Sequence, residues 1–326
     1  MMKKVEMIRG AKKLVDECTQ VKAGEHVLII TDTVIAPSIS EVLAIACKER
    51  GAEPIVMIMS PMKVEQNDPA PPVTEAMQKA QVIFWICSRS NYHSLSRLKA
   101  VKAGARFFIF TQLTEELMVT GAIEANFLET KDLIDRVSEA LGKAKEARVT
   151  TKAGTDLYLD FRGRPEKIVN KNAICHQPGD SSGIILESAI SPKVGSAQGI
   201  IFIDASITLF MPNLVHEPIQ GIIKDGRLVE MKGGIEATKL SQLLKEFNDP
   251  LVYYVAELGI GMNPKAKMMG VKTQDKSVYG TCHIGFGSNI TWGGNIHAAT
   301  HFDMVMYAPK IELDGITLLE NYKFFV

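Results

Sequence analysis

The chain has 326 residues, a length that suits two domains better than a single core. Hydrophobic residues make up 46% and charged residues 23%, which is the composition of a globular protein and excludes a largely disordered one. The 37 Lys and Arg residues equal the 37 Asp and Glu residues, and no basic cluster or stripe interrupts this balance. We therefore expect no nucleic-acid partner.

The N-terminal residues 1–17 have the charge pattern of an amphipathic helix and lack the apolar stretch of a signal peptide. A membrane-spanning helix needs roughly 18 or more apolar residues in a row, and the chain has no such run. The cysteines are scattered without paired spacing, at Cys18, Cys47, Cys87, Cys175 and Cys282. These features predict reduced thiols, a cytoplasmic protein and no membrane partner.

The first half of the chain alternates short apolar runs with helical patterns. Strands are expected over 26–32, 54–59, 81–87 and 106–110, and helices over 38–50, after Pro71-Pro72 and over 93–103. Such continuous apolar strands separated by helices indicate a mostly parallel sheet that is covered on both faces. No Gly-x-Gly-x-x-Gly follows the first strand, so no dinucleotide site is predicted. A charged helix over 131–147 is expected to end this α/β domain, which we place at residues 1–147.

Beyond residue 147 the pattern changes to strand-like segments separated by turn residues. The pair Asp225-Gly226 between two alternating runs predicts a β-hairpin, and a helix is expected over 234–247. The fold class is therefore α/β: an N-terminal, mostly parallel sheet with flanking helices, followed by a β-rich α+β domain over residues 148–326.

The segment His301-Phe302-Asp303 is the sharpest chemical feature of the second half. In a strand, residues two apart point to the same face, so an imidazole and a carboxylate would project together. That pair suits a divalent metal ion. A histidine that is merely oriented by its neighbouring aspartate, or a solvated pair, would give the same pattern.

Three further residues strengthen the prediction of a metal site. His283 lies in a glycine-rich segment, and a hairpin that brings it opposite His301 would supply a third ligand. Glu187 and Glu257 each interrupt an apolar run, and a buried glutamate is costly without a partner such as a metal ion. A strand whose glutamate faces water is the alternative for each.

His93 follows the expected strand 81–87, at the sheet edge where functional groups of α/β proteins collect. A histidine there could carry a proton during catalysis. It could equally be a helix-start residue with no chemical duty.

The second half resembles the thermophilic aminopeptidase family, aminopeptidase T and S, which are zinc- or cobalt-dependent exopeptidases with a two-metal centre. The matching segments are Glu187-x-x-x-x-Pro192, Glu257-Leu-Gly-Ile-Gly-x-Asn263-Pro264, Gly280-Thr-x-His283-Ile and His301-x-Asp303. This resemblance implies that the metal ligands are Glu187, Glu257, His283, His301 and Asp303. The family carries a tyrosine seven residues after the ligand histidine, where this chain has Ile290, and nearby Tyr279 does not match that role.

The chain also resembles the 2,5-dihydroxypyridine 5,6-dioxygenase family, iron-dependent ring-opening enzymes on the same framework. The similarity runs along most of the chain and includes Lys152-Ala-Gly-Thr-Asp156, Gly233-Gly234-Ile-Glu-Ala237, Phe247-Asn-Asp-Pro250 and His93-Ser94 leading to Gly104-x-Arg106. It implies an acid/base role for His93. It also implies one Fe(II) held by two histidines and an aspartate, with a histidine at the position of Glu257.

The sequence alone favours a metal-dependent, aminopeptidase-like hydrolase that cleaves an amide bond in a short peptide or small molecule. Two ions of zinc, cobalt or manganese, bridged by Glu257, would activate a water molecule, and His93 would transfer a proton. The alternative is a mononuclear Fe(II) dioxygenase acting on a hydroxylated N-heterocycle, with the ion held by Glu257, His301 and Asp303. A metal-stabilised binding protein without activity is the third possibility, and the relatives suggest a homodimer.

Overall fold

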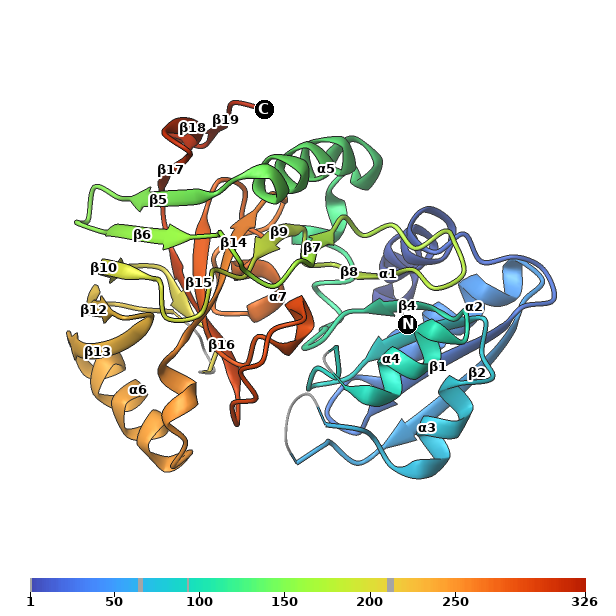
Figure 1. Cartoon of the computed structure of the whole chain (residues 1–326). Helices are drawn as coiled ribbons and strands as arrows, with labels where there is room; N and C mark the ends of the chain where they lie inside the picture. Colours follow the sequence, from blue (N-terminus) through green and yellow to red (C-terminus); the bar gives the residue numbers. More distant parts are fainter. Residues whose placement is uncertain (1, 64–66, 93, 210–213) are drawn as a thin grey trace. The chain divides into compact units, whose positions relative to one another are not determined.

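The computed structural model describes residues 2–63, 67–92, 94–209 and 214–326. The chain forms two compact units, drawn with their elements in Figure 1. The first comprises Met1–Lys131 and Lys171–Ile185, and the second comprises Asp132–Asn170 and Leu186–Val326. Because residues 171–185 belong to the first unit, each unit is built from more than one stretch of the sequence.

The first unit is built on a parallel sheet in the strand order β2-β1-β3-β4-β8. Its central strands are buried, whereas β2 is partly exposed as an edge strand. This confirms the parallel sheet expected from the apolar runs. The strands are β1 (His26–Asp32), β2 (Glu53–Met59), β3 (Val82–Ile86), β4 (Arg106–Ile109) and β8 (Ser181–Gly183).

The helices of the first unit begin where the sequence provides start signals. Prolines stand at the first positions of two of them, and the Ser94 hydroxyl accepts a hydrogen bond from the Arg97 N–H (3.2 Å) at the start of a third. The helical elements are α1 (Met2–Lys12), the π-helix η1 (Lys13–Cys18), α2 (Pro37–Glu49), α3 (Pro71–Met77), α4 (Leu95–Lys102) and the 3₁₀ turn η2 (Gly121–Glu124).

The charged helix expected over 131–147 is shifted in the structure. Helix α5 (Phe127–Lys143) starts earlier and ends at Lys143, and residues 146–150 form a strand instead. The run Glu146–Thr150 alternates in burial, as a half-buried strand does, so Glu146 and Ala147 belong to this strand and not to the helix expected there.

The second unit contains an eight-stranded and a six-stranded sheet, in the orders β13-β12-β10-β6-β5-β17-β18-β19 and β11-β16-β15-β14-β9-β7. The pairings between their neighbouring strands are antiparallel, as predicted for a β-rich domain. The eight-stranded sheet comprises β5 (Glu146–Thr150), β6 (Asp156–Asp160), β10 (Gln198–Ile203), β12 (Ile219–Lys224), β13 (Arg227–Lys232), β17 (Lys310–Leu313), β18 (Ile316–Glu320) and β19 (Lys323–Phe324). The six-stranded sheet comprises β7 (Ile168–Lys171), β9 (Glu187–Ile190), β11 (Ser206–Ile207), β14 (Val255–Gly261), β15 (Cys282–Gly287) and β16 (His301–Met306).

Four short elements complete the second unit: α6 (Ile235–Glu246), the 3₁₀ turns η3 (Pro250–Tyr253) and η4 (Ile290–Trp292), and α7 (Lys272–Asp275). The predicted hairpin is confirmed, because Asp225 (φ +51°) and Gly226 (φ +72°) connect the paired residues Lys224 and Arg227. Positive φ at both central residues is the geometry of a type I′ turn.

All five cysteines are free and buried. Among the described residues, no helix combines the length and apolarity needed to cross a membrane.

Candidate metal centre

Five acidic and imidazole side chains project from one face of the six-stranded sheet. Glu187 begins β9, Glu257 lies within β14, His283 within β15, and His301 and Asp303 begin β16. The strand register brings the last three together, since Asp303 pairs with Gly285 and His301 with Gly287. The predicted hairpin would place His283 opposite His301, but in the structure His283 pairs with Val305. The offset is an even number of residues, so the three side chains still share one face.

Each of the five side chains has a glycine at the paired position of a neighbouring strand. A Cβ atom added at Gly259 would lie 2.0 Å from Nε2 of His283, and one at Gly285 would lie 2.9 Å from Oε2 of Glu257. Gly259 and Gly285 therefore provide space that the side chains of His283, Glu257 and His301 occupy. Gly261 pairs with Glu187, Gly285 with both Glu257 and Asp303, Gly259 with His283, and Gly287 with His301.

Replacing Gly259 with alanine is expected to lower the free energy of unfolding by about 1–3 kcal/mol, because the new methyl group would displace His283. Gly142→Ala is the control: the nearest atom to its added Cβ, Cγ1 of Ile168, is at an ordinary 3.8 Å. Since Gly142 lies within α5, that change should be neutral or stabilising by about 0.5–1 kcal/mol. Urea unfolding of both variants checks this, and an equal effect at the two positions would contradict it.

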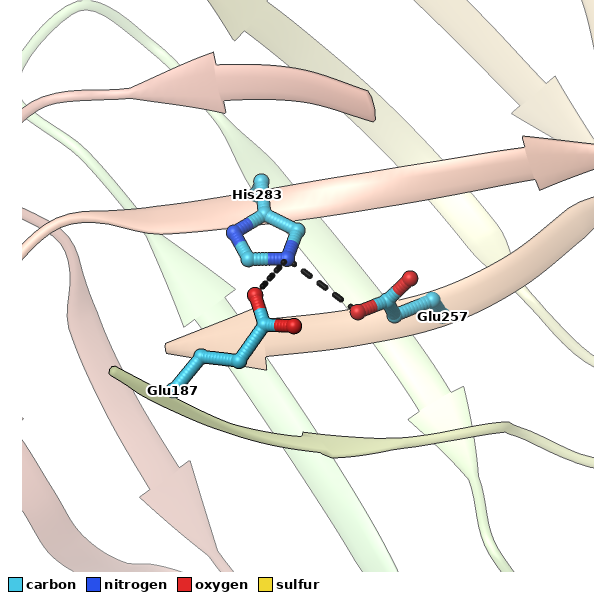
Figure 2. Close-up of side chains that lie close together, drawn as sticks. All are labelled: Glu187, Glu257 and His283. Carbon is cyan, nitrogen blue, oxygen red and sulfur yellow. Dashed lines mark hydrogen bonds and ion pairs between the residues drawn. The ribbon is translucent and has the colours of Figure 1, made fainter. Parts of the chain in front are cut away.

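The five side chains form two groups of possible metal ligands that share Glu257. In the first, Nε2 of His283 lies 3.2 Å from Oε1 of Glu257 and 3.5 Å from Oε2 of Glu187. Figure 2 shows this imidazole, on β15, pointing toward the two carboxylates, which lie on β14 and β9. In the second, Nε2 of His301 lies 2.9 Å from Oε2 of Glu257 and 3.3 Å from Oδ1 of Asp303. The ligand atoms within each group are within 4.8 Å of one another, close enough to surround one ion.

Lys276, which follows α7, places its ammonium group among the same carboxylates. Its Nζ lies 3.0 Å from Oδ2 of Asp303, 3.4 Å from Oε2 of Glu187 and 3.8 Å from Oε1 of Glu257. The lysine side chain is 5% exposed and the three carboxylates 1% or less. The sequence interpretation missed this residue, because its segment has neither an apolar run nor a motif that distinguishes it from the neighbouring Lys272.

Two neighbours orient the ligands on β16. The backbone carbonyl of Ser288 accepts a hydrogen bond from Nδ1 of His301 (2.8 Å), which turns Nε2 of the ring toward Glu257 and Asp303. The backbone N–H of Asp303 donates to the hydroxyl of Thr208 (2.9 Å), and that hydroxyl donates to Oδ2 of Asp303 (3.3 Å). The Trp292 ring lies 5.5 Å from the His301 ring and helps to bury it. Both ligands are therefore held in place before an ion arrives.

The charges in this site shift the ionisation of its members. Burial alone would raise the pKa of Glu257 and Asp303, but the ammonium of Lys276 and the imidazoles hold both pKa values below their usual range. Burial alone would lower the pKa of His301, but hydrogen bonds to Asp303 and Glu257 raise it to about 9. Without a metal ion, the two carboxylates are thus ionised and His301 is protonated at neutral pH.

Two other residues singled out in the sequence, Ile290 and Tyr279, are not part of this cluster. His93 lies outside the described residues. Ile290, at the position of the peptidase tyrosine, begins η4 and is 38% exposed. Tyr279 packs the edge of its ring against Phe324, with ring centroids 5.2 Å apart.

The family model described as NicX, 2,5-dihydroxypyridine 5,6-dioxygenase, matches residues 6–325. The chain belongs to this family. A curated 2,5-dihydroxypyridine 5,6-dioxygenase of Pseudomonas putida strain KT2440 is 28% identical over 239 residues, and the match spans 68% of this chain and 65% of that protein. The family resemblance predicted from the sequence is thereby confirmed.

Two solved structures share the fold. The 2,5-dihydroxypyridine dioxygenase of Pseudomonas putida KT2440 superimposes with a TM-score of 0.85 at 19% identity and covers 99% of this chain and 98% of its own. Wild-type AmpT from Thermus thermophilus superimposes with a TM-score of 0.71 at 13% identity and covers 99% of this chain and all of its own. Both resemblances predicted from the sequence therefore correspond to one fold, which the dioxygenase and AmpT share.

Proposed function

We propose that this chain is a metal-dependent dioxygenase that opens the ring of a hydroxylated N-heterocycle of the dihydroxypyridine class. The observation that carries the proposal is the match of the dioxygenase family to residues 6–325. The group formed by Glu257, His301 and Asp303 supplies three nitrogen and oxygen ligands on one face for a single Fe(II) ion, with a glutamate in place of one histidine of the usual set of two histidines and one carboxylate. This reverses the order favoured by the sequence alone, in which the hydrolase came first.

Ring opening by a dioxygenase balances without an external reductant. Both atoms of O₂ enter the product, one carbon–carbon bond of the ring breaks, and the electron-rich hydroxylated ring supplies the electrons. When bound, Fe(II) would supply the coordination sites and the redox activity that bring O₂ and the ring hydroxyl together.

The residues of this chain would hold and insulate the reacting groups. Ser288 fixes the His301 tautomer through its carbonyl, and Thr208 fixes the Asp303 carboxylate. The site side chains are 8% exposed or less, so the strands of the sheet would keep bulk water from the ligands. Glu257 stands where the dioxygenase resemblance implies a histidine, so the metal site would carry one more negative charge. This charge would favour a substrate that binds without bringing a further negative charge to the site. His93 remains the predicted acid/base residue.

An amide hydrolase is the second candidate. It is favoured by the first ligand group, which has Glu187 and His283 in addition to the shared Glu257, and by the fold shared with AmpT. Such an enzyme would use two ions of zinc, cobalt or manganese bridged by Glu257 and would cleave a short peptide or small amide.

Oxygen uptake separates the two candidates. Protein purified without oxygen, loaded with Fe(II) and mixed with 2,5-dihydroxypyridine is expected to consume one O₂ per ring lost, followed with an oxygen electrode and by ring absorbance. Zinc- or cobalt-loaded protein should leave dipeptide amides intact. No uptake with any hydroxypyridine, together with amide cleavage in the absence of oxygen, would overturn the dioxygenase proposal in favour of the hydrolase.

A further inference from the structure

The two ligand groups differ in what surrounds their oxygen atoms. The ammonium of Lys276 reaches Glu257 through Oε1 and Asp303 through Oδ2, whereas His301 contacts Oε2 and Oδ1, the other oxygen of each. Both carboxylates of the first group, Glu187 and Glu257, face the ammonium at 3.4 and 3.8 Å. The ammonium therefore faces the same carboxylate oxygens as His283 in the first group, whereas in the second group it contacts the oxygens that His301 does not.

The charges of the site balance with a single ion. Glu187, Glu257 and Asp303 contribute three negative charges and Lys276 one positive charge, so the cluster carries −2 when both imidazoles are neutral. One divalent ion cancels this charge. A second would leave +2 among side chains that are at most 8% exposed, and burying such an uncompensated charge is strongly unfavourable.

The two imidazoles also differ in how they are held. Nδ1 of His301 donates to the Ser288 carbonyl, which is the outer-shell partner that metal-binding histidines almost always have. Nδ1 of His283 is buried, and among the described residues no group accepts a hydrogen bond from it. The second group is thus oriented for an ion and the first is not.

We propose that Lys276 takes the place of a second metal ion, so that the chain binds one divalent ion, at Glu257, His301 and Asp303. The first group, with Glu187 and His283, is then an ion-pair network that positions the shared Glu257 through the lysine. The inference rests on the proposed function only in assuming that the site binds metal.

The test counts ions with Mn²⁺ as the probe. Wild-type protein, Lys276→Met, Lys276→Gln and the control Lys272→Met are purified without metal and titrated calorimetrically, and the bound manganese is examined by electron paramagnetic resonance. Lys272 is also buried and lies on adjacent α7, so its variant controls for the loss of a buried lysine as such. The glutamine variant is included because its amide can still donate hydrogen bonds to the carboxylates.

We expect one Mn²⁺ per chain and an uncoupled signal in the wild type and in Lys272→Met. In the two Lys276 variants we expect two Mn²⁺ per chain with a spin-coupled signal, and Mn²⁺ should restore folding where the metal-free variant unfolds. Two ions in the wild type, one ion in folded Lys276 variants, or Lys276 variants that Mn²⁺ does not refold would each overturn the inference. One ion in the wild type without oxygen uptake would instead overturn the dioxygenase and leave the role of Lys276 standing.

Discussion

Replacing His301 with alanine is expected to weaken metal binding by at least about 100-fold and to bring turnover below detection. His301 supplies the nitrogen ligand of the second group, and its contacts at 2.9 Å to Glu257 and 3.3 Å to Asp303 would be lost together. Metal content after dialysis, counted per chain, and the initial rate with added metal measure the two effects.

His216→Ala provides the matched control for that variant. His216 also pairs with a glutamate, Glu236, at 2.9 Å, but its side chain is 76% exposed and it lies outside both ligand groups. Its replacement should leave metal content and rate within about twofold of the wild type, since exposed pairs contribute little. A His301→Ala protein that keeps its ion and its activity would remove His301 from the site.

Metal affinity is expected to rise about tenfold for each unit of pH between 6 and 9 and then to level off. A metal ion binds neutral imidazole, and hydrogen bonds to Asp303 and Glu257 raise the pKa of His301 to about 9 although burial opposes this. Below that pH each binding event must release the proton. The carboxylates add no further dependence in this range, because the pKa values of Glu257 and Asp303 lie below their usual range.

The raised pKa of His301 also makes the stability of the metal-free fold depend on pH, and this stability falls where metal affinity rises. A raised pKa in the folded state contributes stability that is complete below the ordinary value of 6.5 and is lost as the pH rises through about 9.

Calorimetry with Mn²⁺ in buffers of different ionisation enthalpy should report one proton released per ion at pH 7. Affinity that does not change with pH, with no proton released, would contradict this account of His301.

The alternating pattern of the first half was enough to predict its sheet. Runs such as 27–30 and 82–87 are apolar without interruption, as is typical of strands buried on both faces. The Asp225-Gly226 turn was equally predictable, because few residues adopt two consecutive positive φ values. The helix end near Lys143 was missed because the following strand continues the charged composition of the helix.

The five candidate ligands were recognised from local signals, namely glutamates in apolar runs and histidines among glycines. Lys276 was not, since its role depends on three carboxylates that lie between 19 and 89 positions away in sequence and meet it only through the strand register. The return of residues 171–185 to the first unit is likewise a property of the tertiary structure. A homodimer, a cytoplasmic location and a proton-transfer role for His93 stay predictions from the sequence.

Incorporation of ¹⁸O from labelled oxygen gas tests the central claim most directly. Fe(II)-loaded protein is given 2,5-dihydroxypyridine under ¹⁸O₂ in unlabelled water, and the product is analysed by mass spectrometry. A ring-opened product carrying two ¹⁸O atoms, formed by the wild type and not by His301→Ala, is the predicted result. A product that carries oxygen from water alone, or no ring opening at all, would contradict the assignment as a dioxygenase.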